Sequence, residues 1–309
     1  MSATALSMLI SYLRHSGYEF FTPTPATHYR VNRRPGNEKA LDLAGAFGWS
    51  RPFARFLLSD ELFNALRDGG VLWESEHGWN SRLRASTLGE DIFLHSAFPT
   101  TASDAVFFGP DTYRFAREIR SHLAAHPRRL DRVLDLGCGS GAGGVVVAKN
   151  SCCTELVLTD INDAALQLAR VNADSAGLPN VRTKHSDLFS AVEGRFDLIV
   201  ANPPYLNDPL ERAYRHGGGE LGSGLSLRIA QAAKDSLSSG GSLLLYTGSP
   251  IVRGVDRLLQ NIEQSFAGGD LSWSYEEIDP DVFGEELETD SYSQVDRIAA
   301  VVLTAQSRK

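Results

Sequence analysis

VLDLGCGSG, residues 133–141, is the stretch that decides the fold. Val133–Leu136 has the short apolar run of a buried strand. The glycines at 137, 139 and 141 permit a tight turn and close approach of the backbone to a ligand, before a helix begins. Glycine turns occur in many folds, so this pattern is weak evidence alone. The flanking segments decide its interpretation.

Strands and helices alternate on both sides of this turn. Alternation of this kind predicts a parallel, doubly wound α/β sheet. A helix from Asp111 leads into it, with Phe115, Ile119 and Leu123 on one face. The predicted strands are 133–136, 156–159, 181–185, 196–201 and 242–247, followed by an edge pair at 271–278 and 298–304. The predicted helices lie near 141–150, 162–176 and 225–238.

Acidic residues follow the first three strands. Asp135 precedes the first glycine, Asp160 ends the second strand, and Asp187 follows the third, before Leu188. An acid at Asp160 suits the diol of a ribose, and Asp187 can accept from an adenine amino group. Asp135 suits a cation or an amino group more than a pyrophosphate. Alternatively, Asp160 is a helix N-terminal acid and Asp187 an ordinary loop acid.

FDLIVANPPY, residues 196–205, is the second decisive stretch. A buried parallel strand ends abruptly at Asn202, on the edge where open α/β sheets bind ligands. Two prolines stiffen the turn and remove two backbone donors. The Asn202 side-chain oxygen and the Pro203 carbonyl can both accept from one NH2 group, and Tyr205 can stack on its plane. The alternative is an ordinary Asn-Pro turn.

The first 98 residues do not continue the alternation, and we expect a small N-terminal α+β module there, with the larger domain at 99–309. Helices followed by a hairpin favour a winged-helix-like module that recognises substrate or only packs on the core. The predicted elements are helices at Ala3–His15 and from Ser59 to Gly69, a hairpin of Val71–Glu76 and Trp79–Thr87, and a strand at Ile92–Ser96. The arginines of this module form a basic face or an ordinary solvated surface; they are Arg30, Arg33, Arg34, Arg82 and Arg84.

Charge divides the chain unevenly. Residues 1–90 hold 10 Lys or Arg and 9 Asp or Glu, whereas residues 91–309 hold 20 and 29. An acidic large domain argues against broad binding to a phosphate backbone. The three cysteines predict no disulfide scaffold and no metal site, which indicates a reducing compartment. We expect a cytoplasmic protein without a membrane segment.

The motifs DLGCGSG, the acid after strand two, SDLF and ANPPY, in this order, resemble class I S-adenosylmethionine-dependent methyltransferases. Within that class the chain is similar to the group of the release-factor glutamine N5-methyltransferases and the RNA guanine-N2 methyltransferases. The resemblance covers about residues 107–309. It implies a Rossmann-like domain with a seven-stranded sheet, and S-adenosylmethionine as cofactor, with S-adenosylhomocysteine as product.

The resemblance also implies roles for individual residues. Asn202, Pro203 and Tyr205 would be the catalytic residues, with Asn202 near the cofactor as well. No metal is implied. The cofactor contacts would come from the glycine turn, the three acids and the segment before the first core helix: Phe108, Thr112, Asp135, Gly137, Gly139, Gly141, Asp160, Asp187 and Leu188.

The acceptor is left open between a protein glutamine amide, an exocyclic base amine of RNA, and a small natural product. Eight acids between Glu276 and Asp290, without Lys or Arg, are predicted beside the substrate mouth. There they would repel phosphates and attract a basic protein or a cationic small molecule; alternatively they form a solvated loop turned away. The arginines of the N-terminal module favour RNA.

Two further expectations concern activity and access. A glycine-rich run, residues 216–224, is predicted as a mobile cover or as a floppy connection. A catalytically silent cofactor-binding partner subunit is the alternative of a different class. The intact Asn202-Pro203-Pro204-Tyr205 motif argues against it, because a silent subunit has no use for the acceptor pair.

Overall fold

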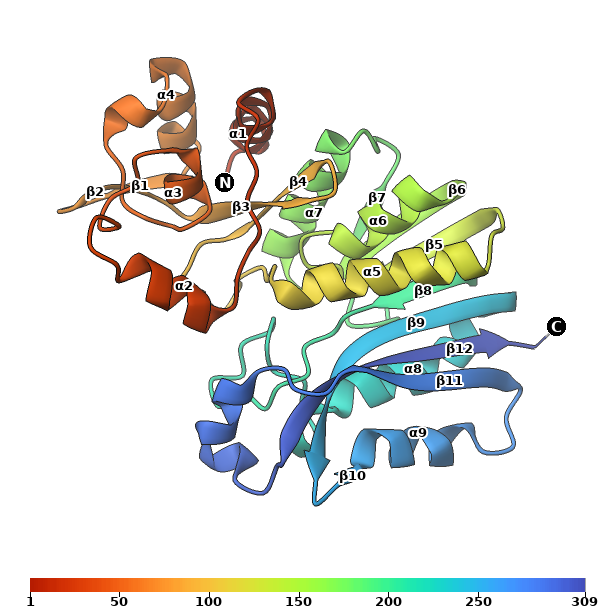
Figure 1. The fold of residues 1–309 in the computed structure, drawn as a ribbon. Helices are drawn as coiled ribbons and strands as arrows, with labels where there is room; N and C mark the ends of the chain where they lie inside the picture. Colours follow the sequence, from red (N-terminus) through yellow and green to blue (C-terminus); the bar gives the residue numbers. More distant parts are fainter. Residues whose placement is uncertain (309) are drawn as a thin grey trace.

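A mostly parallel sheet forms the centre of the computed structural model, which describes residues 1–308 (Figure 1). Within these residues the strand order is β11-β12-β9-β8-β5-β6-β7, with the short β10 beside β9. The five strands from β9 to β7 are parallel neighbours, whereas β12 is antiparallel to both β9 and β11. The strands are β5 (Leu130–Leu136), β6 (Cys153–Asp160), β7 (Arg182–His185), β8 (Phe196–Ala201), β9 (Leu237–Val252), β10 (Val255–Asp256), β11 (Leu271–Asp279) and β12 (Arg297–Ser307).

Helices cover both faces of this sheet. Alternate residues of β5 point to opposite faces: Val133 packs in the cluster of α5, α6 and α7, and Leu134 in that of α8 and α9. Burial on both faces explains why the central strands are apolar throughout. The helices are α5 (Pro110–Ala125), α6 (Ala142–Asn150), α7 (Asp163–Ser175), α8 (Gly224–Ser236) and α9 (Arg257–Phe266), with short 3-10 turns η2 (Glu220–Gly222), η3 (Gly284–Glu288) and η4 (Asp290–Tyr292).

Four helices and two hairpins precede the sheet. In one hairpin β1 pairs with β2, and in the other β3 pairs with β4. The Ser59 side chain caps α4 by accepting from the backbone N–H of Leu62, and Leu62, Phe63 and Leu66 face the core. These elements are α1 (Ala3–His15), α2 (Pro25–Asn32), α3 (Leu43–Phe47), η1 (Arg55–Leu57), α4 (Asp60–Asp68), β1 (Leu72–Ser75), β2 (Gly78–Ser81), β3 (Leu83–Leu88) and β4 (Asp91–Ser96).

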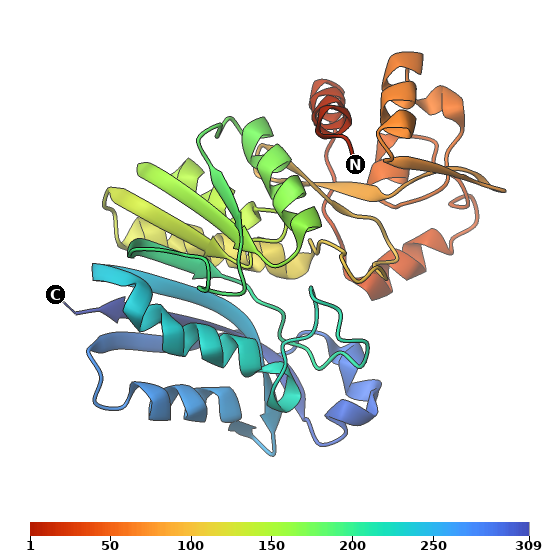
Figure 2. The same ribbon diagram turned by 180° about the vertical axis from the view of Figure 1, so that it is seen from behind.

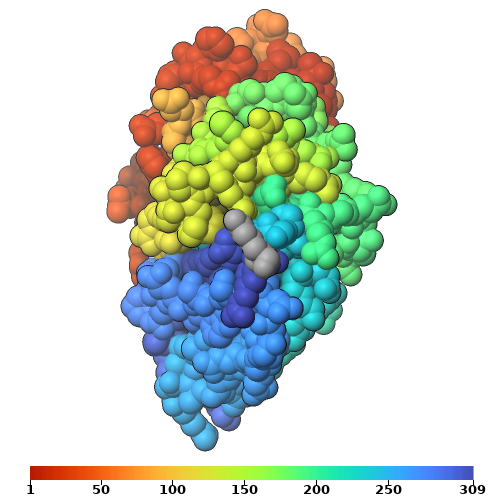
Figure 3. All heavy atoms as spheres, turned by 90° about the vertical axis from the view of Figure 1, so that its right-hand side faces the viewer, coloured from red at the N-terminus to blue at the C-terminus, as the bar shows by residue number. Residues whose placement is uncertain are grey.

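The N-terminal module packs on α7 with a shared core. Ala165, Leu168 and Val171 of α7 join the apolar cluster of the module. Buried Asn172 ties α7 to β4: its side chain accepts from the Leu94 N–H at 2.9 Å and donates to the Leu94 carbonyl at 3.0 Å. The module therefore forms one end of the molecule and the C-terminal strands the other (Figures 2 and 3).

The predicted α/β class with a large, mostly parallel sheet is confirmed, as are a mixed N-terminal module and the helix at Ala3–His15; the short β10 adds an eighth strand to the seven that were predicted. The predicted single strand Trp79–Thr87 is wrong: the chain breaks at Arg82 and continues as β3, which pairs with β4 instead. The boundary after residue 98 and the winged-helix-like arrangement stay predictions. Among the described residues, no helix is long and apolar enough to cross a membrane.

Candidate functional site

A deep pocket lies at the carboxyl ends of β5, β6 and β8, where open α/β sheets hold their ligands. Its empty volume is about 1330 Å³, counting the open solvent at the mouth. Because β8 is the parallel neighbour of β5, with Ala201 opposite Leu136, the ANPPY turn and the glycine turn lie side by side. The walls come from residues 105–107, 111, 112, 115, 135–140, 142, 143, 160–162, 165, 186–188, 202–206, 213–215, Leu225, Ile229 and Phe283.

The glycine turn has the backbone conformation that its sequence predicts. Gly137, Gly139 and Gly141 all have positive φ, at 68°, 52° and 79°. A Cβ on Gly141 would also lie 3.1 Å from the Cβ of Ala169, so the turn packs tightly on α7. Gly137 and Gly139 line the pocket, whereas Gly141 lies behind the wall and begins α6.

Two acids support this turn and line the pocket. Asp135 is buried, its carboxylate accepts from the Gly144 N–H at 2.7 Å, and burial raises its pKa to about 7. Asp160 accepts from the N–H groups of Gly139 and Asn162, both at 2.9 Å, and burial raises its pKa as well. The site thus holds two carboxyl groups in a partly dry setting, which favours a ligand that brings donors or positive charge.

Asp187 and Leu188 line the pocket from the turn that follows β7. The Asp187 side chain is 68% exposed and lies 3.8 Å from the guanidinium of Arg228. Leu188 belongs to the SDLF turn, residues 186–189, and has a positive φ of 49°, which is uncommon for a residue other than glycine. Both residues are therefore where the sequence predicts them, at the end of the third strand.

The ANPPY turn presents acceptors to the pocket. Asn202 and Pro203 both line it. Within residues 1–308 no protein group hydrogen-bonds the Asn202 side chain, whose amide is half-buried at the pocket wall. Pro203 and Pro204 bring no backbone donor, so the turn offers oxygens without competing N–H groups.

Tyr205 has a different role from the predicted stacking platform. Its ring is only 5% exposed and packs edge-on against Phe283, with ring centroids 5.8 Å apart. A Cβ at Gly248 would lie 2.3 Å from the same ring, so β9 closes over it. The hydroxyl of Tyr205 donates to the carboxylate of Asp111. Because ring and hydroxyl are both engaged, Tyr205 anchors the turn.

Asp111 is the centre of a buried polar network that the sequence did not reveal. Its carboxylate accepts from Tyr205, from Tyr246 at 2.8 Å and from Arg114 at 3.1 Å. Arg114 in turn contacts Asp279 at 2.9 Å. Burial raises the pKa of Asp111, while these donors lower it. The network joins α5, β9 and β11 to the ANPPY turn, and two of its members, Asp111 and Tyr205, line the pocket.

The segment before α5 places Phe107, and not Phe108, on the pocket wall. Phe108 is buried in the core between Phe93 and His95, with ring centroids 5.7 and 5.1 Å away. Thr112 lines the pocket as predicted, and its hydroxyl accepts from the Gly109 N–H at 3.2 Å. This bond caps α5, so Thr112 also fixes the first turn of that helix.

The loop after the ANPPY turn folds back over the pocket. Buried Asp208 accepts from Arg212 at 2.6 Å, and Arg215, which lines the pocket, pairs with buried Glu286. Arg212 lowers the pKa of Asp208 to about 2. Tyr214 lines the pocket and donates to the Thr100 carbonyl at 2.7 Å. No spacing pattern in the sequence marks these residues.

The glycine-rich run is packed closely beneath the turn. A Cβ on Gly217 would lie 1.9 Å from the Gly222 carbonyl oxygen, and one on Gly222 would lie 2.4 Å from the carbonyl oxygen of Tyr205. The Gly217 N–H donates to the Leu206 carbonyl at 2.8 Å. Gly217 and Gly222 are therefore required for close backbone packing. The sequence interpretations of this run, a mobile cover or a floppy connection, did not include such packing.

The acidic run lies at the pocket end of the sheet, as predicted, because β11 ends there and β12 begins there. Part of its charge is neutralised. Arg297 makes two bonds of 2.9 Å to Glu277, Asp279 contacts Arg114, and Glu286 contacts Arg215. The exposed acids beside the mouth are Asp281, Glu285, Glu288 and Asp290.

Comparison with known proteins gives one family match. Residues 116–265 match the family model described as Methyltransferase small domain. A ribosomal RNA small subunit methyltransferase C from Haemophilus influenzae is 37% identical over 118 residues, which cover 38% of this chain and 32% of that protein. A release factor glutamine methyltransferase from Escherichia coli is 33% identical over 141 residues, covering 42% of this chain and 51% of that protein. The chain thus matches about half or less of these relatives' length.

Solved structures agree on the fold. Trm5b from Pyrococcus abyssi is 15% identical, with a TM-score of 0.51 over 74% of this chain and 56% of that chain. A tRNA m1G37 methyltransferase from Methanocaldococcus jannaschii is 16% identical, with a TM-score of 0.50 over 74% and 55%. Identity this low supports only the shared architecture of the sheet and its helices.

Proposed function

We propose that the chain transfers a methyl group from S-adenosylmethionine to a planar nitrogen, and the match of residues 116–265 to the methyltransferase small domain model supports this. The acceptor is a glutamine amide of a protein or an exocyclic amine of an RNA base. The observation that carries this proposal is the position of Asn202 and Pro203, which line the same pocket as the glycine turn.

The pocket residues fit this cofactor. The glycine turn brings bare backbone to the wall, and a Cβ at Gly143 would lie 2.7 Å from Phe115 and 3.0 Å from Asp135, which leaves no room for a side chain there. Asp135 would hold the amino group of the methionine part, and Asp160 the ribose diol. Asp187 and Leu188, which also line the pocket, would hold the adenine.

The cofactor would supply an electrophilic methyl group on a sulfonium. The protein must then position a weak nucleophile, since the lone pair of an amide or base nitrogen is delocalised. Asn202 and the Pro203 carbonyl would accept the two NH2 hydrogens and turn the lone pair toward the methyl carbon. Such positioning and aimed dipoles account for most of the rate in this type of site.

The buried network would keep this geometry fixed. Tyr205 follows directly after the two prolines and is anchored on Asp111, which belongs to α5. Any shift of the turn would have to break this bond or open the packing against Gly248. The acceptor pair is therefore held by rigid elements of the sheet and of α5, which is what an oriented reaction requires.

Two alternatives to methyl transfer onto protein or RNA can be distinguished by experiment: methylation of a small natural product, and a silent cofactor-binding subunit. A small natural product would also fit a pocket of this size, and a silent cofactor-binding subunit would keep the cofactor residues without the acceptor pair. Methyl-labelled S-adenosylmethionine is incubated with the protein and a cell extract, and the labelled product is treated with ribonuclease or protease. We expect S-adenosylhomocysteine to form, with macromolecular label sensitive to one enzyme. Label in small molecules alone indicates a natural product, and no product at all contradicts methyl transfer.

A further inference from the structure

Arginines and exposed aromatic rings gather on one side of the N-terminal module, around α2. Residues 25–55 hold six Lys or Arg and only two acids. Both acids already serve the backbone: Glu38 accepts from the Gly36 N–H at 3.1 Å, and Asp42 caps α3 by accepting from the Gly45 N–H at 2.7 Å. This side therefore carries positive charge that its own acids do not neutralise.

The cations of this surface have no acidic partners. The ion pairs made by arginines of the module join Arg55 to Asp60 and Arg67 to Asp68. Among the residues that the structure describes, none of Arg30, Arg33, Arg34 and Arg82 takes part in an ion pair, and all four are exposed. We call these four, together with Tyr29 and Phe21, the α2 surface. Arg84, predicted to belong to it, is buried at 5% exposure and does not.

Aromatic rings stand among these cations. Tyr29 is 56% exposed and Phe21 is 60% exposed. The Arg33 guanidinium lies 5.0 Å from the centre of the Tyr29 ring. Exposed rings between arginines form the arrangement on which unpaired bases stack while phosphates are neutralised.

The α2 surface is joined to the mouth of the pocket by direct contacts. His28 of α2 packs on Phe98, with ring centroids 4.1 Å apart, and two residues later the Thr100 carbonyl accepts from Tyr214 of the pocket wall. Phe21 packs on Tyr113, next to Thr112 of the wall. In both ribbon views α2 lies beside the loop that follows β8 (Figures 1 and 2).

We propose that the α2 surface docks single-stranded RNA and delivers an unpaired base to the pocket. This inference rests on the proposed methyl transfer and selects RNA as its substrate class. A base must be unstacked to reach a buried reacting atom, and RNA readers hold such bases on aromatic and arginine planes. The exposed acids of the run after β11 would repel the phosphates and so favour their binding at the arginines of α2.

The test measures binding of a labelled 12-nucleotide single-stranded RNA by fluorescence anisotropy at 50 and 200 mM salt. Four phosphate contacts predict a loss of affinity of about 50-fold between these salt concentrations. The double variant Arg33→Ala and Arg34→Ala keeps two contacts, so its loss falls to about sevenfold. Tyr29→Ala weakens binding about tenfold by removing a stacking ring, whereas Tyr29→Phe restores it.

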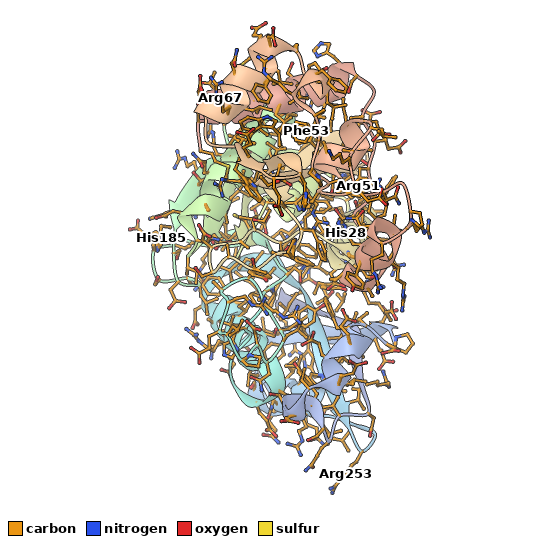
Figure 4. The ribbon with its side chains drawn as sticks, turned by 90° about the vertical axis from the view of Figure 1, so that its left-hand side faces the viewer. His28, Arg51, Phe53, Arg67, His185 and Arg253 are labelled. Carbon is orange, nitrogen blue, oxygen red and sulfur yellow. The ribbon has the colours of Figure 1, made fainter. Side chains whose placement is uncertain are left out.

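The matched control is the double variant Arg253→Ala and Arg129→Ala, which removes two exposed arginines outside the α2 surface. Figure 4 shows Arg253 at one end of the molecule, well away from His28 and Arg51. We expect the control to keep the wild-type salt dependence. Equal salt dependence in all variants, or no RNA binding by the wild type, would overturn the proposal. An acidic peptide of equal charge that binds as tightly would assign this surface to a protein partner instead, and would also overturn it.

S-adenosylhomocysteine formation is followed in the same samples, so that the two proposals fail separately. RNA binding that depends on the α2 surface, without any product, contradicts the methyl transfer and leaves the docking surface standing. Product formation with RNA binding unaffected by the arginine and tyrosine variants contradicts the docking surface alone.

Discussion

Tyr205→Phe removes a single hydroxyl from the network beneath the ANPPY turn. The hydroxyl donates to Asp111, a buried carboxyl that also accepts from Tyr246 and Arg114. A hydrogen bond to a charged group contributes about 1.5–3 kcal/mol. Two donors remain on Asp111 in the variant, so we expect a loss in the free energy of unfolding of about 2 kcal/mol. For a chain of this size that lowers the melting temperature by about 3 °C.

Tyr205→Phe should also lower the rate of methyl transfer. Without its anchor the turn can shift, and a misplacement of about 1 Å can cost about 100-fold in rate. We expect turnover to fall by about tenfold or more, while the affinity for S-adenosylmethionine stays near that of the wild type. Melting temperature is measured by circular dichroism, cofactor affinity by calorimetry, and turnover by S-adenosylhomocysteine release.

Tyr275→Phe is the matched control, because the Tyr275 hydroxyl also donates to a carboxylate, Asp256 at 2.7 Å, but does not line the pocket. This variant should lose similar stability and keep full turnover. If Tyr205→Phe and Tyr275→Phe lower turnover equally, the Asp111 anchor has no special role. An unchanged melting temperature in Tyr205→Phe would refute the energetic reasoning itself.

Three further predictions concern single residues. Because burial raises the pKa of Asp135 to about 7, the ligand-free folded state keeps a proton on Asp135 that the unfolded chain releases above about pH 4, and the stability that this proton contributes is lost as the pH rises toward 7. Between pH 5 and pH 8 the melting temperature should therefore fall more in the wild type than in Asp135→Asn. An equal fall in both proteins would contradict this. Gly141→Ala should lower the melting temperature more than Gly177→Ala does. Both glycines have a φ of 79°, but only a Cβ at position 141 would contact Ala169. Equal decreases in melting temperature would exclude this packing argument. Arg84→Met should leave the free energy of unfolding in urea unchanged or raise it. Burial lowers the pKa of the Arg84 guanidinium to about 10, and no acid in residues 1–308 pairs with it. A clear decrease in the free energy of unfolding would indicate that Arg84 has a buried partner.

Local patterns predicted most of the large domain. The strands β5, β6 and β8 contain short apolar runs bounded by polar residues, and burial on both faces makes such runs visible in a sequence. The glycine turn was predictable because only glycine adopts its positive φ angles without strain. The acids of the site follow from the same geometry, since they sit where the strands end.

Contacts between distant segments could not be predicted. Tyr205 was expected to stack on a substrate, because nothing in the sequence links it to Asp111, 94 residues earlier. Phe107 and Phe108 are adjacent in an irregular segment, where no periodicity tells which one faces the pocket. Arg84 resembles a surface residue of a hairpin, yet β3 is buried along its whole length.

The central claim is tested most directly by Asn202→Ala, with Asn207→Ala as its control. Asn207 belongs to the same loop but does not line the pocket. Single-turnover transfer of labelled methyl groups is measured for both variants, after calorimetry has established that they bind S-adenosylmethionine. The account predicts a loss of about 100-fold or more for Asn202→Ala, the scale of removing one aimed dipole, and near wild-type transfer for Asn207→Ala. Wild-type transfer by Asn202→Ala would contradict the claim that this turn holds the methylated nitrogen.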